Sequence, residues 1–324
     1  MLKGKNLIFF LDAPTVDLGD VDLAALRRQG RLALLDLRAG DPLPAEVDSA
    51  EVLISNKYPL GKPELSRLPR LKLIAVAATG TNNVDLEEAR RRGIAVCNVA
   101  GYSGDTVVEH TLLFLLAFSH RFLEHVRAVQ EGRWSASPYF ALLDYPFSDL
   151  AGKRLGILGY GDIGRRVAKV ATGLGMEVKA GRLPGRPLAK GERREPIRRL
   201  LERSDYISLH CPLTTRTQSL IDAEKLAWMK PGAYLLNLAR GPIVEEAAVA
   251  QALRSGRLAG YGADVMSREP PPAEHPLLAP DLRDRVLLTP HVAWASRESR
   301  QRLVDEIAAN IAAFKVGKKR NRVV

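Results

Sequence analysis

Cysteine is scarce in this chain of 324 residues, and Cys97 and Cys211 stand alone without a CxxC pair. Two isolated thiols cannot build the disulfide framework of a small secreted domain or a cysteine-based zinc site. We therefore expect a protein of a reducing compartment, the cytoplasm, that holds no metal.

Long apolar runs are also missing. The longest run inside the chain, Leu112–Phe118, is far shorter than the roughly 20 residues that span a bilayer. At the N-terminus the apolar stretch of Met1–Leu11 stops at Asp12, and no small-residue cleavage site follows it. We predict a first β-strand there rather than a signal peptide, and no membrane partner.

Acidic residues are outnumbered: 37 Asp and Glu face 48 Lys and Arg, which gives a formal net charge of +11. A nucleic-acid binder would gather its cations on one element, interleaved with aromatic residues. Here the arginines form short clusters that fit solvated helix faces, at Arg90–Arg92, Arg193-Arg194 and Arg198-Arg199. We expect no nucleic-acid partner, and a positive field that attracts small anionic substrates.

Short apolar runs alternate with longer amphipathic stretches along the chain, which is typical of βα repetition, parallel sheets and an α/β fold. The length favours two domains. We expect strands at Leu7–Leu11, Val52–Ser55, Leu71–Ala77, Ile94–Cys97, Leu155–Leu158, Glu177–Lys179, Tyr206–His210, Tyr234–Leu238, Gly260–Val265 and Val286–Thr289. Helical stretches are expected over Thr106–Gln130 and Arg300–Phe314, and a surface loop over Gly181–Gly191.

The residues Gly159-Tyr-Gly-Asp-Ile-Gly164 have the GxGxxG spacing of dinucleotide-binding turns, with a strand before them and an amphipathic helix after them. Gly159 would permit the tight turn, Gly161 the approach of backbone to a pyrophosphate, and Gly164 the close packing of helix on strand. The N-terminus of the helix would face the phosphates with its free N–H groups. The sequence therefore predicts a dinucleotide site at this turn.

The choice between NADH and NADPH depends on the end of the next strand. An Asp or Glu about twenty residues further on would bind the ribose 2′-hydroxyl of NAD. That region, Val178-Lys-Ala-Gly-Arg-Leu-Pro-Gly-Arg186, holds no carboxylate. Arg182 falls at the position, unless a slip of one residue puts Gly181 there. Arg182 and Arg186 suit a 2′-phosphate and favour NADPH, unless both are only loop surface.

Three polar residues each follow the carboxyl end of an expected strand: Arg240, Glu269 and His291. Ligands of open α/β sheets bind beyond the carboxyl ends of the strands, so we expect these side chains to converge near the nicotinamide. A histidine suits proton transfer at a hydroxyl, a carboxylate orients its ring, and an arginine fork binds a carboxylate. The set predicts hydride transfer at C2 of a small 2-hydroxy or 2-keto acid. Each residue taken alone would suit a loop with no catalytic role.

Several segments carry a resemblance that spans nearly the whole chain: Ala77–Asp85, Gly159–Gly164, His210–Pro212, Asn237–Gly241, Asp264–Pro270 and Thr289–Ser296. They resemble the D-isomer-specific 2-hydroxyacid dehydrogenase family. Within it the chain is similar to bacterial glycerate dehydrogenases (hydroxypyruvate reductases), on the basis of Leu142–Pro146, Glu269–Pro272, His275–Leu278, Trp294–Ser296 and Asn321–Val324.

The resemblance implies two Rossmann-like doubly wound parallel-sheet domains. A flavodoxin-like catalytic domain of residues 1–101 and 293–324 would be interrupted by a dinucleotide-binding domain of residues 102–292. The resemblance also implies a homodimer, with the segment from Phe122 to Pro146 as an arm.

The resemblance assigns roles to residues. Arg240, Glu269 and His291 would be catalytic, with His291 as acid and base. Backbone amides of Ala78, Thr79 and Gly80, with Arg240, would bind the substrate carboxylate. Besides the Gly-rich turn and Arg182, the residues expected to line NAD(P) are Thr106, Asp162, Ile163, Pro212, Thr217, Ala239 and Asp264. The reaction would reduce hydroxypyruvate or glyoxylate to D-glycerate or glycolate.

Some features depart from the family pattern. Leu238 stands where a small polar residue is usual, and Gly104–Val108 differs from the usual loop. A different 2-keto acid, such as a phosphorylated one of the 3-phosphoglycerate type, is an alternative substrate. A dinucleotide-sensing scaffold like the family's corepressors is an alternative class. Formate dehydrogenases usually carry Gln in the acid position, so Glu269 argues against that chemistry.

Overall fold

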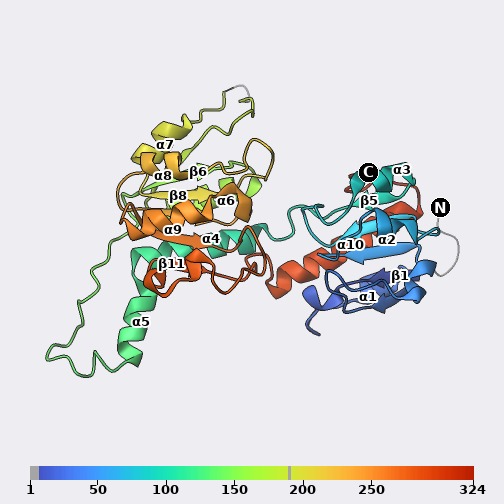
Figure 1. The fold of residues 1–324 in the computed structure, drawn as a ribbon, viewed down its shortest axis with the longest axis horizontal. Coiled ribbons are helices and arrows are strands. Elements are labelled where there is room, and N and C mark those ends of the chain that lie inside the picture. Colours follow the sequence, from blue (N-terminus) through green and yellow to red (C-terminus); the bar gives the residue numbers. More distant parts are fainter. Residues whose placement is uncertain (1–6, 189–190) are drawn as a thin grey trace. The chain divides into compact units, whose positions relative to one another are not determined.

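In the computed structural model, residues 7–188 and 191–324 are described. The chain divides into two compact units (Figure 1). Unit 1 combines Met1–Ser103 with Trp294–Val324, and unit 2 is Gly104–Ala293. The first six residues of the strand expected over Met1–Leu11, and residues 189–190 of the expected loop, lie outside the described residues.

Unit 1 contains a five-stranded sheet in the order β2-β1-β3-β4-β5, with every pair parallel. This is the flavodoxin-like order. The strands are β1 (Leu7–Phe10), β2 (Arg31–Leu34), β3 (Val52–Ser55), β4 (Leu73–Val76) and β5 (Ala95–Cys97). The helices are α1 (Ala24–Arg27), α2 (Lys62–Ser66), α3 (Leu86–Arg91) and α10 (Arg297–Lys315), with 3-10 turns at η1 (Ala13–Thr15) and η2 (Ala45–Ser49).

The last helix explains why unit 1 is discontinuous in sequence. The N-terminus of α10 is capped by Ser296, whose hydroxyl oxygen accepts from Ser299 N at 3.2 Å. The apolar face of α10 packs on β4 and α1, and one apolar cluster joins Leu303, Val304, Ile307 and Ile311 to Leu73 and Ala75. Burial of this face stabilises the unit, since each buried aliphatic side chain contributes about 1.5–3 kcal/mol.

Unit 2 contains a six-stranded parallel sheet in the order β11-β10-β9-β8-β6-β7. Its strands are β6 (Arg154–Leu158), β7 (Glu177–Ala180), β8 (Tyr206–Leu209), β9 (Ala233–Asn237), β10 (Leu258–Ala263) and β11 (Val286–Leu288). Its helices are α4 (Gly104–Ser119), α5 (Phe122–Gln130), α6 (Asp162–Gly173), α7 (Ile197–Arg203), α8 (Ala223–Trp228) and α9 (Glu246–Arg254), with 3-10 turns at η3 (Gly241–Ile243), η4 (Pro276–Leu278) and η5 (Pro280–Leu282).

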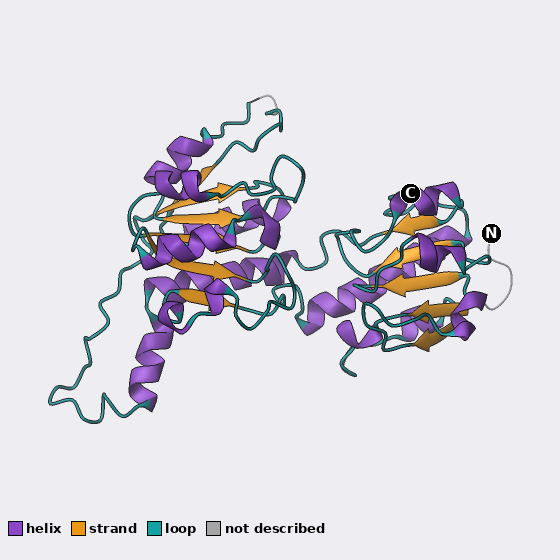
Figure 2. Ribbon diagram, in the orientation of Figure 1, coloured by secondary structure: helices purple, strands orange, loops and turns teal. Residues whose placement is uncertain are grey.

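Helices cover both faces of the unit 2 sheet (Figure 2). One apolar cluster receives Leu200, Leu226 and Val249 from α7, α8 and α9, and the other receives Phe114 and Val167 from α4 and α6. The strand order reverses between β6 and β8, which in doubly wound folds opens a ligand crevice at the carboxyl ends. The α/β doubly wound class expected from the sequence is confirmed.

Two local expectations were inaccurate. The helical stretch over Thr106–Gln130 is broken at Arg121, whose φ of +49° lies in the left-handed region and separates α4 from α5. The edge strand β2 was not expected, although Leu32–Leu35 is a short apolar run; its residues are exposed or half-buried at the edge of the sheet. None of the helices in the described part of the chain has the length and apolar character that a bilayer crossing needs.

Candidate active site at the carboxyl edge of the sheets

The Gly-rich turn joins β6 to α6 as the spacing predicts. Gly159 has φ +106°, and a Cβ there would lie 2.3 Å from the carbonyl carbon of His210. A Cβ on Gly164 would lie 2.2 Å from the carbonyl oxygen of Gly159. A Cβ on Gly161, by contrast, would meet no atom within 4 Å. Two glycines are thus required for packing and the third borders open space, an arrangement that fits a pyrophosphate.

The residues around this turn are placed at helix starts. Asp162 and Ile163 form the first turn of α6, and Asp162 Oδ2 pairs with Arg166 Nε at 3.0 Å. Arg166 also pairs with Asp105 at 2.7 Å, which joins the start of α6 to the first turn of α4, where Thr106 lies. The helix N-terminus provides N–H donors for an anion.

The remaining residues expected to line the cofactor follow three neighbouring strands. Pro212 and Thr217 follow β8, and Thr217 Oγ1 donates to Pro212 O at 2.7 Å. Ala239 follows β9, and its N–H donates to Asn237 Oδ1 at 3.1 Å. Asp264 follows β10 directly. All of them therefore lie at the same edge of the sheet as the Gly-rich turn.

The end of β7 carries no carboxylate. Gly181 is buried, and a Cβ there would lie 2.6 Å from the Leu158 side chain. Arg182 is exposed, and its Nε donates to Arg194 O at 3.1 Å. Between the two positions that the sequence left open, Arg182 is the one with a side chain that faces solvent at this edge.

Glu269 and His291 are in direct contact. His291 Nδ1 lies 2.7 Å from Glu269 Oε2. The other carboxylate oxygen, Oε1, accepts from Met266 N at 2.9 Å, so both oxygens are held. The contact orients the imidazole ring, because one ring nitrogen is held by the carboxylate.

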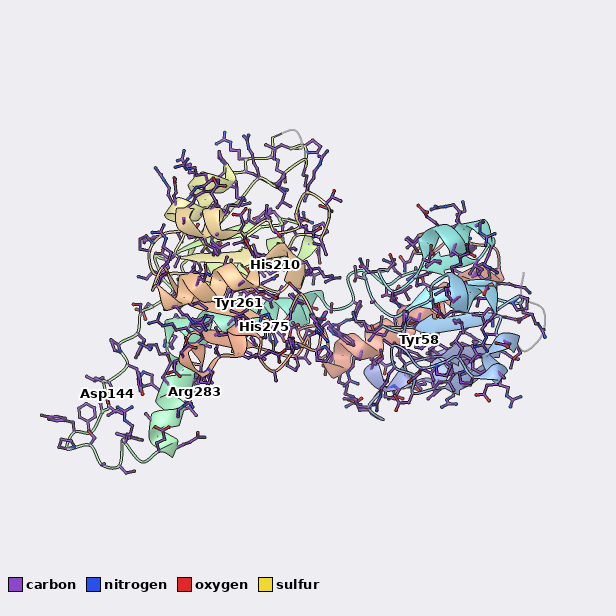
Figure 3. All side chains as sticks on the ribbon, in the orientation of Figure 1. Tyr58, Asp144, His210, Tyr261, His275 and Arg283 are labelled. Carbon is purple, nitrogen blue, oxygen red and sulfur yellow. The ribbon has the colours of Figure 1, made fainter. Side chains whose placement is uncertain are left out.

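The loop that carries Glu269 has an anchor that sequence reasoning missed. Ser267 N donates to Glu246 Oε1 at 2.7 Å, and Glu246 Oε2 lies 3.2 Å from His275 Nε2. Figure 3 labels His275 on the ribbon of unit 2. The Glu246 side chain is 8% exposed, so this polar contact is buried. No motif identifies Glu246, because its partners lie more than twenty residues away in sequence.

Asp264 holds the loop that carries His291. Its carboxylate, on a residue 2% exposed, accepts from Thr289 Oγ1 at 2.6 Å, Val292 N at 2.8 Å and Ala293 N at 2.8 Å. These bonds fix the backbone on both sides of His291, whose φ is +55°. The sequence assigned Asp264 only to the cofactor, whereas the structure places it as the support of the loop.

His110 joins this network from α4. Its Nε2 lies 2.9 Å from Thr289 Oγ1. Burial lowers the pKa of His110, and the nearby Asp264 carboxylate opposes that shift. This contact supports the loop that carries His291.

Arg240 follows β9 beside the same loops. Its carbonyl oxygen accepts from Asn237 Nδ2 at 3.0 Å, and its Nη1 donates to Ala239 O at 2.7 Å. A Cβ on Gly241 would lie 2.0 Å from the carbonyl carbon of Met266. The backbone after Arg240 therefore packs against the loop of Glu269, which makes the two strand ends neighbours.

In unit 1, Ala78, Thr79 and Gly80 follow β4 at the carboxyl edge of its own sheet. Thr79 Oγ1 donates to Val99 O at 2.8 Å, and Thr79 O accepts from Asn98 Nδ2 at 2.7 Å. Within the described residues, the backbone N–H groups of Ala78, Thr79 and Gly80 donate to no protein acceptor. Three such donors in a fixed loop suit the binding of a carboxylate.

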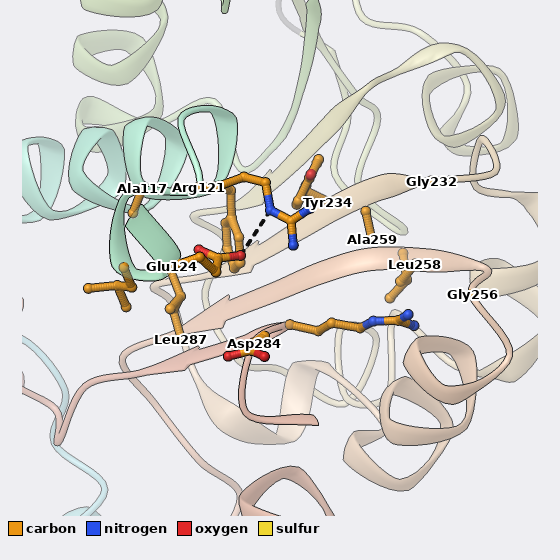
Figure 4. Close-up of a pocket in the computed structure, with 13 residues that line it drawn as sticks. Ala117, Arg121, Glu124, Gly232, Tyr234, Gly256, Leu258, Ala259, Asp284 and Leu287 are labelled. Atoms are coloured by element: carbon orange, nitrogen blue, oxygen red, sulfur yellow. Dashed lines mark hydrogen bonds and ion pairs between the residues drawn. The ribbon is translucent and has the colours of Figure 1, made fainter. Parts of the chain in front are cut away.

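A cavity of about 260 Å³ lies at the opposite, amino edge of the unit 2 sheet (Figure 4). Gly232, which precedes β9, and Asp284, which precedes β11, border it, and Arg121 pairs with Glu124 across it at 3.0 Å. Because the Gly-rich turn, Glu269 and His291 lie at the carboxyl edge, this cavity is separate from the candidate active site.

A doubly wound sheet with a Gly-rich turn and a carboxylate–imidazole pair at the same edge defines a dinucleotide-dependent dehydrogenase. Residues 112–293 match the family model described as D-isomer specific 2-hydroxyacid dehydrogenase, NAD binding domain. The chain therefore belongs to this family and is an NAD(P)-dependent oxidoreductase that acts on 2-hydroxy acids, as the sequence predicted.

Named relatives extend the match over most of the chain. The chain is 43% identical over 278 residues to the glycerate dehydrogenase of Methylorubrum extorquens, with 86% of each chain covered. It is 35% identical over 315 residues to the hydroxypyruvate reductase of Blautia hydrogenotrophica, covering 96% of this chain and 97% of that one. The solved NADPH-dependent glyoxylate/hydroxypyruvate reductase of Sinorhizobium meliloti, in complex with NADP and malonate, has a TM-score of 0.82 at 26% identity and covers 99% and 97%.

Proposed function

We propose that this protein reduces hydroxypyruvate and glyoxylate to D-glycerate and glycolate. The observation that carries the proposal is the 2.7 Å contact between Glu269 and His291 at the cofactor edge of the sheet. Support for the substrate comes from the similarity to a glycerate dehydrogenase and a hydroxypyruvate reductase. The substrate is a small anion, which suits the net charge of +11.

The roles of the side chains follow from their chemistry. The nicotinamide supplies the hydride when it is bound. Arg240 binds the substrate carboxylate with its planar fork and polarises the adjacent carbonyl. His291 donates a proton from Nε2 to the keto oxygen during reduction and removes it during oxidation. Glu269 holds the ring by Nδ1 and stabilises the imidazolium. In unit 1, the backbone amides of Ala78, Thr79 and Gly80 are proposed to bind a substrate carboxylate.

The cofactor is held by the carboxyl edge of unit 2. Gly161 leaves room for the pyrophosphate at the start of α6, and Gly159 and Gly164 allow the close packing of the turn. The residues proposed to line the rest of the cofactor crevice are Thr106, Asp162, Ile163, Pro212, Thr217, Ala239 and Asp264. We propose that NADPH is preferred over NADH, because Arg182 and no carboxylate follows β7.

We also propose that the protein forms a homodimer in the cytoplasm. Large apolar side chains are exposed along α5 and the segment after it, including Phe122, Trp134, Tyr139, Phe140 and Leu143. Many exposed large apolar side chains in one segment are typical of a protein interface. Both cysteines are buried and unpaired, which suits a reducing compartment.

One panel tests the proposed reaction. NADPH and NADH oxidation would be followed by absorbance with hydroxypyruvate, glyoxylate, pyruvate and 3-phosphohydroxypyruvate. We expect the highest kcat/KM with hydroxypyruvate and NADPH. A higher kcat/KM with 3-phosphohydroxypyruvate would show that the phosphorylated acid, and not hydroxypyruvate, is the substrate. Tight cofactor binding without turnover of any keto acid would favour a sensing scaffold.

A further inference from the structure

The segment after β7 makes a tight turn over Leu183–Arg186. Arg186 N donates to Leu183 O at 3.3 Å, and Gly185 has a φ of +69°. Pro184 followed by Gly185 supplies the residue types that favour such a turn. Leu183 is 7% exposed and belongs to the apolar core of unit 2. The first residue therefore anchors the turn, and the rest of it faces solvent.

Three arginines belong to this turn, one of them from another element. Arg182 directly precedes the turn, and Arg186 is its last residue. Arg216 comes from the loop after β8, and its side chain lies directly over Gly185, because a Cβ there would be 1.7 Å from Arg216 Nη1. Thr214 holds that loop, since its Oγ1 accepts from Arg216 N at 3.3 Å.

These three guanidinium groups have no carboxylate partner. Within residues 7–188 and 191–324, Arg182, Arg186 and Arg216 take part in no ion pair. The nearby carboxylates are engaged elsewhere: Glu192 pairs with Arg194, and Glu195 pairs with Arg154 at 2.7 Å. Like charges gathered on one turn repel each other, so the group is best stabilised by a multivalent anion.

The position of the turn identifies the anion. It directly follows β7, the strand beside the Gly-rich turn, where the adenosine ribose lies in doubly wound folds. We propose that Arg216 is a specificity-determining residue, which binds the 2′-phosphate of NADPH together with Arg182 and Arg186. Because Gly185 has no Cβ, the Arg216 guanidinium can pack directly against its backbone. This inference rests on the proposed NADPH preference and adds the second loop to it.

Binding of cofactor to the full-length protein tests the inference without turnover. Dissociation constants for NADPH and NADH would be measured by fluorescence titration, and those for adenosine 2′,5′-bisphosphate and 5′-AMP by calorimetry. We expect Arg216→Gln to weaken NADPH and the bisphosphate about tenfold or more, as loss of one charge-assisted contact implies. The dissociation constants of NADH and 5′-AMP should change less than about twofold, because neither molecule carries the 2′-phosphate.

Two further variants make the result specific. Arg203→Gln removes the same charge from the end of α7, which lies at the opposite edge of the sheet, and should leave all four constants unchanged. Gly185→Ala keeps Arg216 but places a Cβ at a positive φ in the space that the Arg216 guanidinium occupies. This variant should also weaken the binding of NADPH. Unchanged NADH binding in each variant shows that the fold is intact.

The outcomes separate this inference from the proposals on which it rests. A wild-type protein that prefers NADPH, with a preference that survives Arg216→Gln, overturns the role of Arg216 and leaves the cofactor preference standing. A wild-type protein that binds NADH more tightly overturns the preference. In that case, selectively weaker binding of adenosine 2′,5′-bisphosphate by Arg216→Gln still supports the phosphate site. Unchanged binding of the bisphosphate rejects the site. Failure of every keto acid to react leaves these binding constants measurable.

Discussion

At the scale of single residues, the candidate chemistry depends on how tightly Glu269 and His291 are held. One carboxylate oxygen contacts the imidazole at 2.7 Å and the other accepts a backbone N–H at 2.9 Å, so rotation of Glu269 would break two interactions. An oriented acid or base contributes roughly 10²- to 10⁴-fold to a reaction. The side chains of His291 and Glu269 are 24% and 37% exposed, respectively, which leaves the pair accessible to a substrate.

We expect His291→Ala to lower kcat about 10²- to 10⁴-fold, because it removes the proton donor and acceptor. The cofactor dissociation constant should change less than twofold, since the Gly-rich turn does not depend on the imidazole. His120→Ala, which removes an exposed histidine at the end of α4, is the matched control. Wild-type kcat in His291→Ala would remove this residue from the mechanism.

A different histidine, His210, contributes to the dependence of stability on pH. His210 Nε2 lies 2.8 Å from Ser208 Oγ, whereas its buried Nδ1 has no partner within the described residues. Burial lowers the pKa of His210 from 6.5 to about 4. Between these two values the unfolded chain binds a proton that the folded protein does not. The free energy of unfolding therefore falls as the pH drops from 6.5 to about 4.

His210→Gln should remove this dependence, because glutamine keeps a hydrogen-bonding group near Ser208 and does not titrate. Chemical denaturation of both proteins at several pH values between 7 and 4 measures the effect. We expect the wild type to lose up to about 3 kcal/mol more than the variant over this range. Parallel pH profiles in the two proteins would contradict the assignment.

At the scale of elements, two loops at the carboxyl edge carry Glu269 and His291, and each has one buried carboxylate as its support. Asp264 fixes the backbone around His291 by bonds to Thr289, Val292 and Ala293. Glu246 at the start of α9 fixes the loop before Glu269. Preorganised loops reduce the cost of assembling a reactive geometry.

We expect Glu246→Ala to lower kcat about tenfold or more, although Glu246 does not contact the proposed substrate position. The variant leaves Ser267 N and His275 without their acceptor, which costs about 1 kcal/mol in unfolding free energy. Glu246→Gln should restore part of kcat, since an amide oxygen can still accept from Ser267. Loss of stability with an unchanged kcat would show that the anchor is only structural.

At the scale of the whole molecule, the cofactor unit exposes apolar side chains far beyond what single surface residues require. Phe140 is 94% exposed, Leu143 is 80% exposed and Tyr139 is 76% exposed, all on the segment that follows α5. Burying such groups against a second copy would stabilise an assembly by about 25 cal/mol per Å² of apolar surface. This is the physical basis of the proposed dimer.

We expect Phe140→Asp combined with Leu143→Asp to shift the protein from dimer to monomer in sedimentation velocity. Cofactor binding by the monomer should be retained, because the Gly-rich turn lies on β6 and α6. A conservative double variant, Phe140→Leu with Leu143→Met, should remain dimeric. A wild-type protein that sediments as a monomer would refute the assembly.

The parallel sheets and the Gly-rich turn were predictable because they depend on local spacing. Buried strands appear as short apolar runs, and Gly164 packs on Gly159 within one strand–turn–helix unit, whereas Gly159 also packs on His210 after β8. The resemblance of short motifs to the family's pattern predicted Glu269 and His291 as site residues. The edge strand β2 was missed although it carries a short apolar run, and the break at Arg121 was not predictable because no Gly or Pro marks it.

The sequence by itself therefore determined the fold class, the dinucleotide turn and the family, since each depends on residues close together along the chain. Only the tertiary structure decided which groups support them. Asp264 was readable as a cofactor residue, yet its carboxylate holds the loop of His291. Arg216 was an unremarked loop residue until folding brought it over Gly185. Such contacts join segments tens of residues apart, and no local pattern encodes them.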